Sequence, residues 1–444
     1  LKDLPEAPRN ALPAHETLVQ RQKMFGYTYE DVRKVLVPLA LTSIDPLGAM
    51  GVDSPIAVLS NHSQPLFNYF KQLFAQVTNP PIDAIREEII TSSYTTLGSE
   101  GDITAPTAAS CHQILLKTPI LNNDELNKLI HIQREGFKTV TLPILFRSAN
   151  GEPELEVAME KLFATADKAI EEGANILVLS DRLADADNAP IPSLLAVSGL
   201  HHHLIRLGKR TRVSLILESG EPRQVHHFCT LLGYGAQAIN PYLAFESLED
   251  LIREGLLPNL KHEYAVQKYI KGVTKGVIKV MSKIGISTIQ SYRGAQIFEA
   301  LGISQEVINK YFTATASRIG GIDLNTIAQE TLMRHQRAYD HHDAEQRSLR
   351  AGSVFQWRDS EEEHQYNPST IYTLQKAVRT GDYQLYKQYS KLLHEDAEVK
   401  FNLRNLLEFN FAEQPIPLSE VEPACEIVKR FKSGAMSFGS ISQE

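Results

Sequence analysis

The sequence predicts an α/β protein whose central part consists of parallel β/α units in a partial-barrel-like arrangement. From about residue 125, apolar segments alternate with segments of helical period, and they recur at intervals of roughly 25 to 40 residues. These apolar segments are continuous rather than alternating, which is typical of strands buried on both faces of a parallel sheet. The expected strands cover residues 139–146, 175–180, 213–218 and 236–240.

Helices are expected around these strands because apolar residues recur there with the period of a helix. Short turns at Gly173 and Gly235 lead from a helix into the next strand. The expected helices cover residues 125–135, 154–172, 194–207, 222–232 and 263–283, and a further strand is expected at 287–290.

Before residue 125 the pattern is less regular. Three prolines interrupt any early helix, so residues 1–30 are expected to form a linker. The prolines at Asn79-Pro80-Pro81 end another helical pattern. The elements expected in this region are helices at 29–41, 66–74 and 83–91 and a short strand at 56–60.

Residues 311–430 differ in character from the central part. The segment 334–350 is highly charged and is expected to be a solvated excursion, and 415–423 is expected to be a linker. The helices expected here cover residues 371–378, 383–393 and 424–431.

Composition limits the possible functions. The 444 residues predict two or three domains. The formal net charge of −8 argues against non-specific nucleic-acid binding, and no run of about 18 apolar residues predicts a membrane span. The sequence begins with Leu1 rather than Met, so we expect it to be a segment of a longer protein.

Charged residues follow two of the expected strands. Asp181 and Arg182 follow one strand, and Glu218 and Glu221 follow the next. Enzymes with parallel sheets place catalytic groups at this edge, so Arg182 could bind a carboxylate and Glu218 could act as a base. The alternative is structural: these side chains cap helices and close the rim, with Glu221 in a first helical turn.

Metal and nucleotide motifs are weak. His201-His202-His203 and His226-His227 are consecutive, and neighbouring residues of a helix point in different directions. The three cysteines, Cys111, Cys229 and Cys425, are too far apart for a zinc or iron–sulfur motif. We therefore expect no metal ligands, and we find neither a dinucleotide fingerprint nor a P-loop.

Three loops leave alternatives open. Residues 45–55 form either a glycine-rich connection or an active-site loop with Met50 against a ring. Residues 79–81 either stop a helix or present backbone carbonyls to a neutral guest such as ammonia. The small residues of 434–444 fit a serine-rich turn or the close approach of a flat ring or phosphate.

Taken in order, several segments resemble the central part of the glutamate synthase large subunit, and the resemblance covers essentially all 444 residues. The segments that carry it include GAMGVDSPIAVLS and the stretch that ends in QVTNPPID. They are residues 48–60, 67–83, 218–221, 232–242, 287–299, 315–322 and 434–442.

The resemblance implies a domain organisation. Residues 1–12 would be a linker from an amidotransferase domain, 13–310 the central domain, and 311–444 the N-terminal part of the FMN-binding domain. That last part would supply the helical entry and the first strand of a (β/α)8 barrel. The parent enzyme would use FMN and a [3Fe-4S] cluster to make two L-glutamate from L-glutamine and 2-oxoglutarate with two electrons.

The resemblance also implies site residues. Thr78 and Asn79 match a segment that lines an ammonia tunnel, and Met50 matches a methionine at the edge of the substrate and flavin site. FMN-contacting positions of the first barrel strand are matched at the end of the chain, by Met436, Ser437 and Gly439. Phe438 stands where many relatives have Tyr. No catalytic residue is expected within the segment itself.

The expected partners are the amidotransferase, FMN-barrel and β-helix domains of the same polypeptide, with ferredoxin or an NAD(P)H-oxidising small subunit as electron donor. The expected compartment is the cytoplasm or the plastid stroma. Two other interpretations remain: a non-catalytic scaffold between domains, and an unrelated metabolic barrel enzyme.

Overall fold

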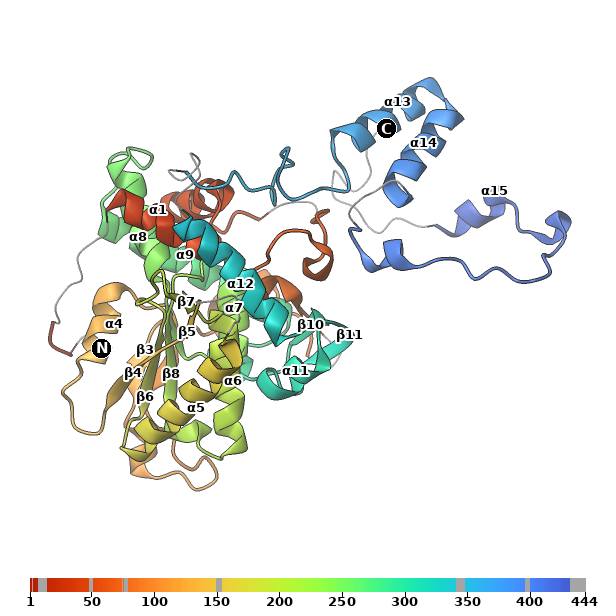
Figure 1. The fold of residues 1–444 in the computed structure, drawn as a ribbon. Helices are drawn as coiled ribbons and strands as arrows, with labels where there is room; N and C mark the ends of the chain where they lie inside the picture. Colours follow the sequence, from red (N-terminus) through yellow and green to blue (C-terminus); the bar gives the residue numbers. More distant parts are fainter. Residues whose placement is uncertain are drawn as a thin grey trace. The chain divides into compact units, whose positions relative to one another are not determined.

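The computed structural model describes residues 1, 3–6, 14–47, 51–73, 75, 79–148, 154–340, 348–395 and 400–431. The chain divides into two compact units (Figure 1). One comprises Leu1–Val52 and Ile56–Glu362, and the other comprises Asp53–Pro55 and Glu363–Glu444.

The first unit is built on a four-stranded parallel sheet with the order β4-β6-β8-β9. Spatial order follows chain order, and a helix lies in the chain between each strand of this sheet and the next strand of the sheet, as in one part of a β/α barrel. This confirms the expected parallel β/α units. The elements are β4 (Thr139–Pro143), α5 (Leu155–Glu171), β6 (Ile176–Ser180), α6 (Ser193–Arg206), β8 (Ser214–Glu218), α7 (Val225–Gly233), β9 (Ala238–Asn240) and α8 (Tyr242–Arg253).

Both faces of this sheet are buried, which explains the continuous apolar strands. In β6, Leu177 and Leu179 join the larger core cluster with the crossover helices, whereas Ile176 and Val178 join a separate cluster. The second cluster is completed by α4 (Asn123–Ile130) and by the antiparallel pair β2 (Thr95–Leu97) and β3 (Ile114–Leu116). The face that would line the interior of a closed barrel is therefore covered by other elements of the chain.

The strand expected at 139–146 is divided in two. After β4, the chain continues into β5 (Leu145–Arg147), which pairs antiparallel with β7 (Asn188–Pro190). Ile144 lies at the division, and its backbone N–H donates to Ser180 O (2.9 Å).

The expected N-terminal linker is wrong beyond residue 14. The helix α1 (His15–Met24) buries Leu18 and Met24 and packs against α12 (Leu324–Tyr339). The helix expected at 29–41 is present as the π-helix η1 (Asp31–Leu36) followed by α2 (Val37–Thr42). α2 packs against the long helix α9 (His262–Lys283), which was expected at 263–283.

A second sheet contains pairings that the sequence did not reveal. The expected helix at 66–74 is wrong: a 3-10 turn, η3 (Leu66–Tyr69), leads into β1 (Phe70–Gln72). β1 pairs with β10 (Phe298–Ile303), more than 200 residues away, and β10 pairs with β11 (Ala316–Ile322). The other two expected strands are also wrong, because 56–60 contains the 3-10 helix η2 (Ala57–Leu59) and α10 (Ile289–Tyr292) begins within 287–290.

The expected solvated excursion at 334–350 is wrong in its first part. Residues up to Tyr339 continue α12, and Arg334 and His335 on this helix are buried. The remaining helices of the first unit are α3 (Ala84–Ile90) and α11 (Gln305–Tyr311).

The second unit contains a helical hairpin at the expected positions, α13 (Pro368–Thr380) and α14 (Tyr383–His394). Gly381 joins them with a φ of +65°. A short helix, α15 (Ala424–Ile427), follows near the end of the described chain. The expected first barrel strand lies outside the described residues. Among the helices that the structure describes, none has the length and apolar character needed to cross a bilayer.

Gly235 provides a test of the packing before β9. It has a φ of +115°, and a Cβ atom there would collide with the ring of His201. Gly173 precedes β6 with a φ of +92°, but no atom lies within 4 Å of the point that a Cβ would occupy there. We expect Gly173→Ala to cost about 1–2 kcal/mol through backbone strain alone. Gly235→Ala should cost about 1–3 kcal/mol more because the core is overpacked.

The measurement is the unfolding midpoint of the two variants in urea. Equal losses for the two glycines would contradict the role assigned to the His201 contact.

Candidate functional site

The carboxyl edge of the parallel sheet gathers the charged residues that the sequence singled out. Asp181 and Arg182 follow β6, Glu218 ends β8, and Tyr242 begins α8 directly after β9. All lie at the ends of strands, where the sequence placed candidate chemistry. The question is whether any of them is available to a ligand.

Arg182 binds two carboxylates of its own chain. Its Nε donates to Glu218 Oε1 (2.6 Å) and its Nη1 to Glu246 Oε1 (3.0 Å). The guanidinium also lies over the ring of Tyr242, 4.0 Å from the centroid. Burial alone would lower the pKa of Arg182, but Glu218 and Glu246 raise it on balance. Two carboxylates of the chain itself therefore already balance the charge of Arg182.

Glu218 is equally occupied. Besides Arg182, it accepts a hydrogen bond from Ser180 Oγ (2.6 Å). A general base needs an oxygen directed at a substrate proton. The observed contacts favour the structural alternative for both Arg182 and Glu218.

Asp181 is a buried acid of this edge. Its Oδ1 accepts from Gly220 N (3.0 Å) and from the Tyr242 hydroxyl (2.9 Å). Burial raises the pKa of Asp181 to about 7. Burial and the nearby Asp181 also raise the pKa of Tyr242. These contacts hold the loop after β8 against the start of α8.

Glu221 caps a helix, but not the one expected. α7 begins only at Val225, so Glu221 lies before its own helix. Its Oε2 accepts from Ser193 N (2.9 Å) and Ser193 Oγ (2.5 Å) at the start of α6. A carboxylate at that position is stabilised by the unpaired N–H groups of the first turn.

The N-terminal segment covers this edge. The Tyr27 hydroxyl donates to Gly220 O (3.0 Å), and Arg223 lies over the Tyr27 ring at 4.4 Å. Arg223 also pairs with Asp31 (Nε to Oδ2, 3.1 Å) and donates to Gly26 O (2.8 Å). The site that β/α enzymes normally keep open is therefore filled by the chain's own residues 26–31.

Four of these five histidines make separate structural contacts, whereas the buried Nε2 of His202 has no hydrogen-bond partner among the described residues. His201 accepts from Arg210 Nε (2.9 Å), and His203 contacts Asp167 (Nε2 to Oδ2, 2.8 Å). His227 stacks on Phe67 at 4.3 Å. Burial lowers the pKa of His201, His202, His226 and His227, so these rings are neutral near pH 7.

Of the site residues implied by the resemblance, Asn79 is the one that falls within the described part of the chain. Its Nδ2 donates to Ile284 O (2.6 Å), just after α9. Gly285 follows with a φ of +76°, and a Cβ there would collide with the carbonyl oxygens of Asn79 and Pro80. These two carbonyls therefore face the end of α9. Thr78, Met50, Met436, Ser437 and Gly439 lie outside the described residues.

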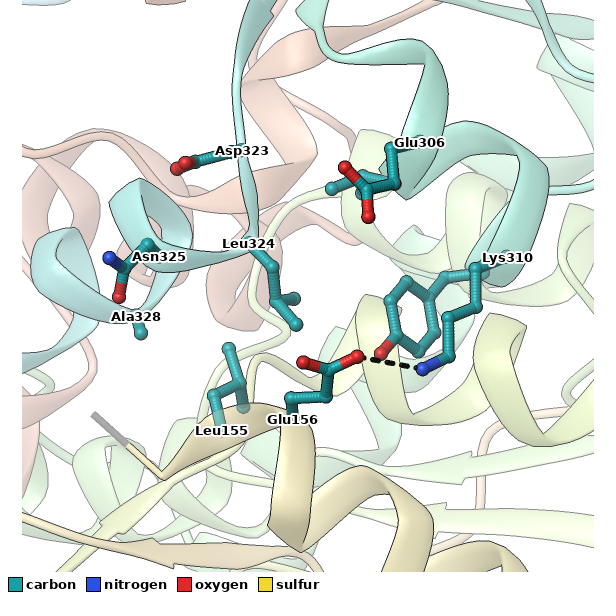
Figure 2. Close-up of a pocket in the computed structure, with 10 residues that line it drawn as sticks. Leu155, Glu156, Glu306, Lys310, Asp323, Leu324, Asn325 and Ala328 are labelled. Atoms are coloured by element: carbon teal, nitrogen blue, oxygen red, sulfur yellow. Dashed lines mark hydrogen bonds and ion pairs between the residues drawn. The ribbon is translucent and has the colours of Figure 1, made fainter. Parts of the chain in front are cut away.

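Two cavities of the first unit are formed by described residues. The smaller, about 260 Å³, is lined in part by Lys310, whose ammonium lies 2.9 Å from Glu156 (Figure 2). The same ammonium lies 2.8 Å from Glu160. The larger, about 850 Å³, is lined by residues 26–31, 62–65 and 348–362, by Arg223 and by α12. The larger cavity was not expected from the sequence, because residues 334–350 were expected to form a solvated excursion. The helical period at Ile327, Ala328, Thr331, Leu332 and His335 is the signal that could have revealed it.

The fold and these contacts define a β/α domain whose usual catalytic edge is closed. Residues 20–304 match the sequence model of the glutamate synthase central domain, and 364–444 match that of a conserved region in glutamate synthase. The chain belongs to the glutamate synthase central-domain family, which confirms the resemblance seen in the sequence.

Individual relatives of the chain are also glutamate synthases. The chain is 54% identical over 427 residues to the glutamate synthase [NADPH] large chain of Bacillus subtilis. It is 43% identical to the glutamate synthase [NADH] of Schizosaccharomyces pombe and 40% identical to the ferredoxin-dependent glutamate synthase of Cyanidium caldarium. These matches cover 96%, 95% and 98% of this chain but only 27%, 20% and 28% of the relatives.

Solved structures are more distant. A flavocytochrome b2 variant with benzoylformate aligns with 72% of this chain and 97% of its own, at 10% identity and a TM-score of 0.32. A chimeric (S)-mandelate dehydrogenase variant aligns with 64% of this chain and 98% of its own, at 10% identity and a TM-score of 0.33. Likeness at this level supports no statement about this chain.

Asp181 gives the edge a distinct pH dependence. Its pKa is 3.8 in an unperturbed chain and about 7 in the fold, so the folded state holds the proton more tightly. The resulting stability is fully present below about pH 4 and is lost as the pH rises through about 7. We expect the stability difference between the wild type and Asp181→Asn to fall across this window, by at most about 4 kcal/mol.

Urea unfolding at intervals from pH 4.5 to 8 measures this difference. The buried histidines contribute equally to both proteins and cancel. Asp102→Asn is the control, because hydrogen bonds from Thr104 lower the pKa of Asp102 and its titration lies below the window. A pH-independent difference for Asp181→Asn would contradict the prediction.

Proposed function

We propose that this chain is the central segment of a glutamate synthase, with the start of the FMN-binding domain. The parent enzyme is an oxidoreductase that makes two L-glutamate from L-glutamine and 2-oxoglutarate with two electrons, in ammonia assimilation. The observation that carries the proposal is the 54% identity over 427 residues to a glutamate synthase large chain. We assign the central domain to residues 13–310 and the start of the FMN-binding domain to 311–444.

Within that enzyme, the segment couples the glutaminase and FMN sites and forms part of the ammonia path. Two features support a non-catalytic role for its described part. The charged residues of the sheet edge bind one another, and the N-terminal segment covers them. The carbonyls of Asn79 and Pro80 lie against Gly285. The geometry of residues 79–81, the proposed wall of the ammonia path, therefore depends on the end of α9.

The cofactors of the parent enzyme are FMN and a [3Fe-4S] cluster. FMN would contact Met436, Ser437 and Gly439, and Met50 would lie at the edge of the substrate site. Cys111 and Cys425 are exposed, Cys229 is buried, and all three are unpaired. Separate cysteines of this kind do not fit a cluster, so the cluster ligands belong to another part of the parent protein.

The partners are the amidotransferase, the rest of the FMN barrel and the β-helix domain. Ferredoxin or an NAD(P)H-oxidising subunit supplies electrons, in the cytoplasm or the plastid stroma. The names of the relatives include NADPH, NADH and ferredoxin-dependent forms, so we propose one of these three as the electron donor. A purely passive scaffold is the second candidate, favoured by the closed sheet edge.

Thr78→Trp in the full-length enzyme distinguishes a tunnel wall from a passive scaffold. A bulky indole in the tunnel wall should block ammonia transfer, so glutamine-dependent glutamate synthesis falls at least about tenfold while glutaminase activity persists. Assays of both activities on one preparation provide the measurement. Full synthesis in this variant would favour the passive scaffold.

Gly285→Ala tests the same wall from the opposite side. The added Cβ collides with the carbonyls of Asn79 and Pro80, so the segment must move. We expect glutamine-dependent synthesis to fall while the glutaminase activity remains. The flavin should also remain bound, since the change lies in the wall rather than in a cofactor contact.

Gly208→Ala is the matched control. Gly208 also follows a helix with a similar φ, +66° against +76°, but a Cβ added there would have no atom within 4 Å. Both variants carry the same backbone strain, and only Gly285→Ala displaces the wall. Equal activity losses in the two variants would count against the proposed role of residues 79–81.

A further inference from the structure

The larger cavity concentrates arginines from three parts of the first unit. Arg223 comes from the loop after β8, Arg334 and Arg337 from α12, and Arg350 from the segment after it. Arg334 and Arg337 are three positions apart, so they lie on one face of the helix. The cavity, about 850 Å³, is large enough for a small metabolite.

Arg334 is buried without a carboxylate partner among the described residues. Its Nη1 donates to Gln64 O (3.0 Å) and its Nη2 approaches Thr331 Oγ1 at 3.4 Å. Only 7% of the residue is exposed. Burial lowers the pKa of Arg334 although the carboxylates of Glu221 and Glu330 oppose this shift, and Arg223 nearby lowers it further. A buried guanidinium that binds only neutral acceptors is an unusual and costly arrangement.

The chain makes room for this side chain at Gly26. A Cβ atom there would lie 2.9 Å from Arg334 Cδ, and Gly26 has a φ of +68°. Arg337 is exposed on the same helix and forms no ion pair with a described carboxylate. Burial and the neighbouring Arg350 lower the pKa of Arg337. The cavity is therefore lined by two pairs of like charges, Arg334 with Arg223 and Arg337 with Arg350.

The acids of the cavity are mostly engaged elsewhere. Glu30 accepts from the N–H groups of Val354 (2.7 Å) and Phe355 (3.1 Å), and Asp31 binds Arg223 and Gln224. Glu361 pairs with Arg350, and Glu362 accepts from Ser60 and Gln64. Among the described residues, none of these acids forms an ion pair with Arg334 or Arg337.

We propose that this cavity is a binding site for a small free carboxylate, held by Arg334 and Arg337. A guanidinium binds a planar carboxylate through two parallel hydrogen bonds. The lining carries five basic and six acidic side chains. A dicarboxylate such as succinate spreads its two charges over two separate groups, whereas phosphate concentrates its charge on one centre, which the acids would repel more strongly. The site goes beyond the proposed function, which does not require it.

The test is hydrogen–deuterium exchange of the full-length protein with succinate as the probe. Peptides that cover residues 26–31 and 334–340 report on the cavity. We expect succinate to protect both peptides, and inorganic phosphate at matched ionic strength to protect neither. Arg337→Gln should weaken the succinate effect at least about tenfold, as expected for the loss of a charge-assisted bidentate contact. Arg337 is exposed, so this variant is expected to fold.

Arg33→Gln is the control, because Arg33 is an exposed arginine of η1 that does not line the cavity. Arg334→Gln is a second variant that should also abolish protection.

The proposal is overturned if succinate protects neither peptide, or if it protects Arg337→Gln as well as the wild type. It is also overturned if both peptides are already protected without ligand and only Arg337→Gln releases them, since the carboxylate would then come from the protein itself. Glutamine-dependent synthesis, measured in parallel, separates each of these outcomes from a failure of the proposed function.

Discussion

The ion-pair network around Arg182 is the interaction on which the first unit most depends. It joins the end of β6 to the end of β8 through Glu218, and to α8 through Glu246. Removing these charges from water is costly, and the cost is offset only when every partner is in place. The network therefore forms only when both strand ends and the helix after β9 have reached their final positions.

This network also determines where function can lie. In open and closed β/α folds, ligands bind at the carboxyl edge of the strands because the loops there surround an open space. Here Tyr27 and Arg223 close that space, and the other face of the sheet is covered by α4, β2 and β3. The remaining candidate sites are the wall at residues 79–81 and the arginine-lined cavity, which Tyr27 and Arg223 themselves border.

The sequence predicted the parallel sheet well and the rest unevenly. Strands buried on both faces, such as β6 and β8, have a local signature, and their crossover helices are long and amphipathic. β1 has three residues and becomes a strand only by pairing with β10, a contact that no local pattern encodes. Arg334 and His335 were assigned to solvent because they are charged or polar, whereas α12 buries both. The resemblance named Asn79, but only the structure placed its neighbour Pro80 against Gly285.

The glycines show why such sites escape sequence reasoning. Gly26, Gly208 and Gly285 have nearly the same left-handed φ, between +66° and +76°. In sequence they are therefore equivalent, as turns that only glycine enters without strain. They differ in what lies beside them, which is open space at Gly208, the Arg334 side chain at Gly26, and two carbonyls at Gly285. Conformation explains why each position is a glycine, but only the neighbouring atoms explain which of them a functional wall or cavity requires.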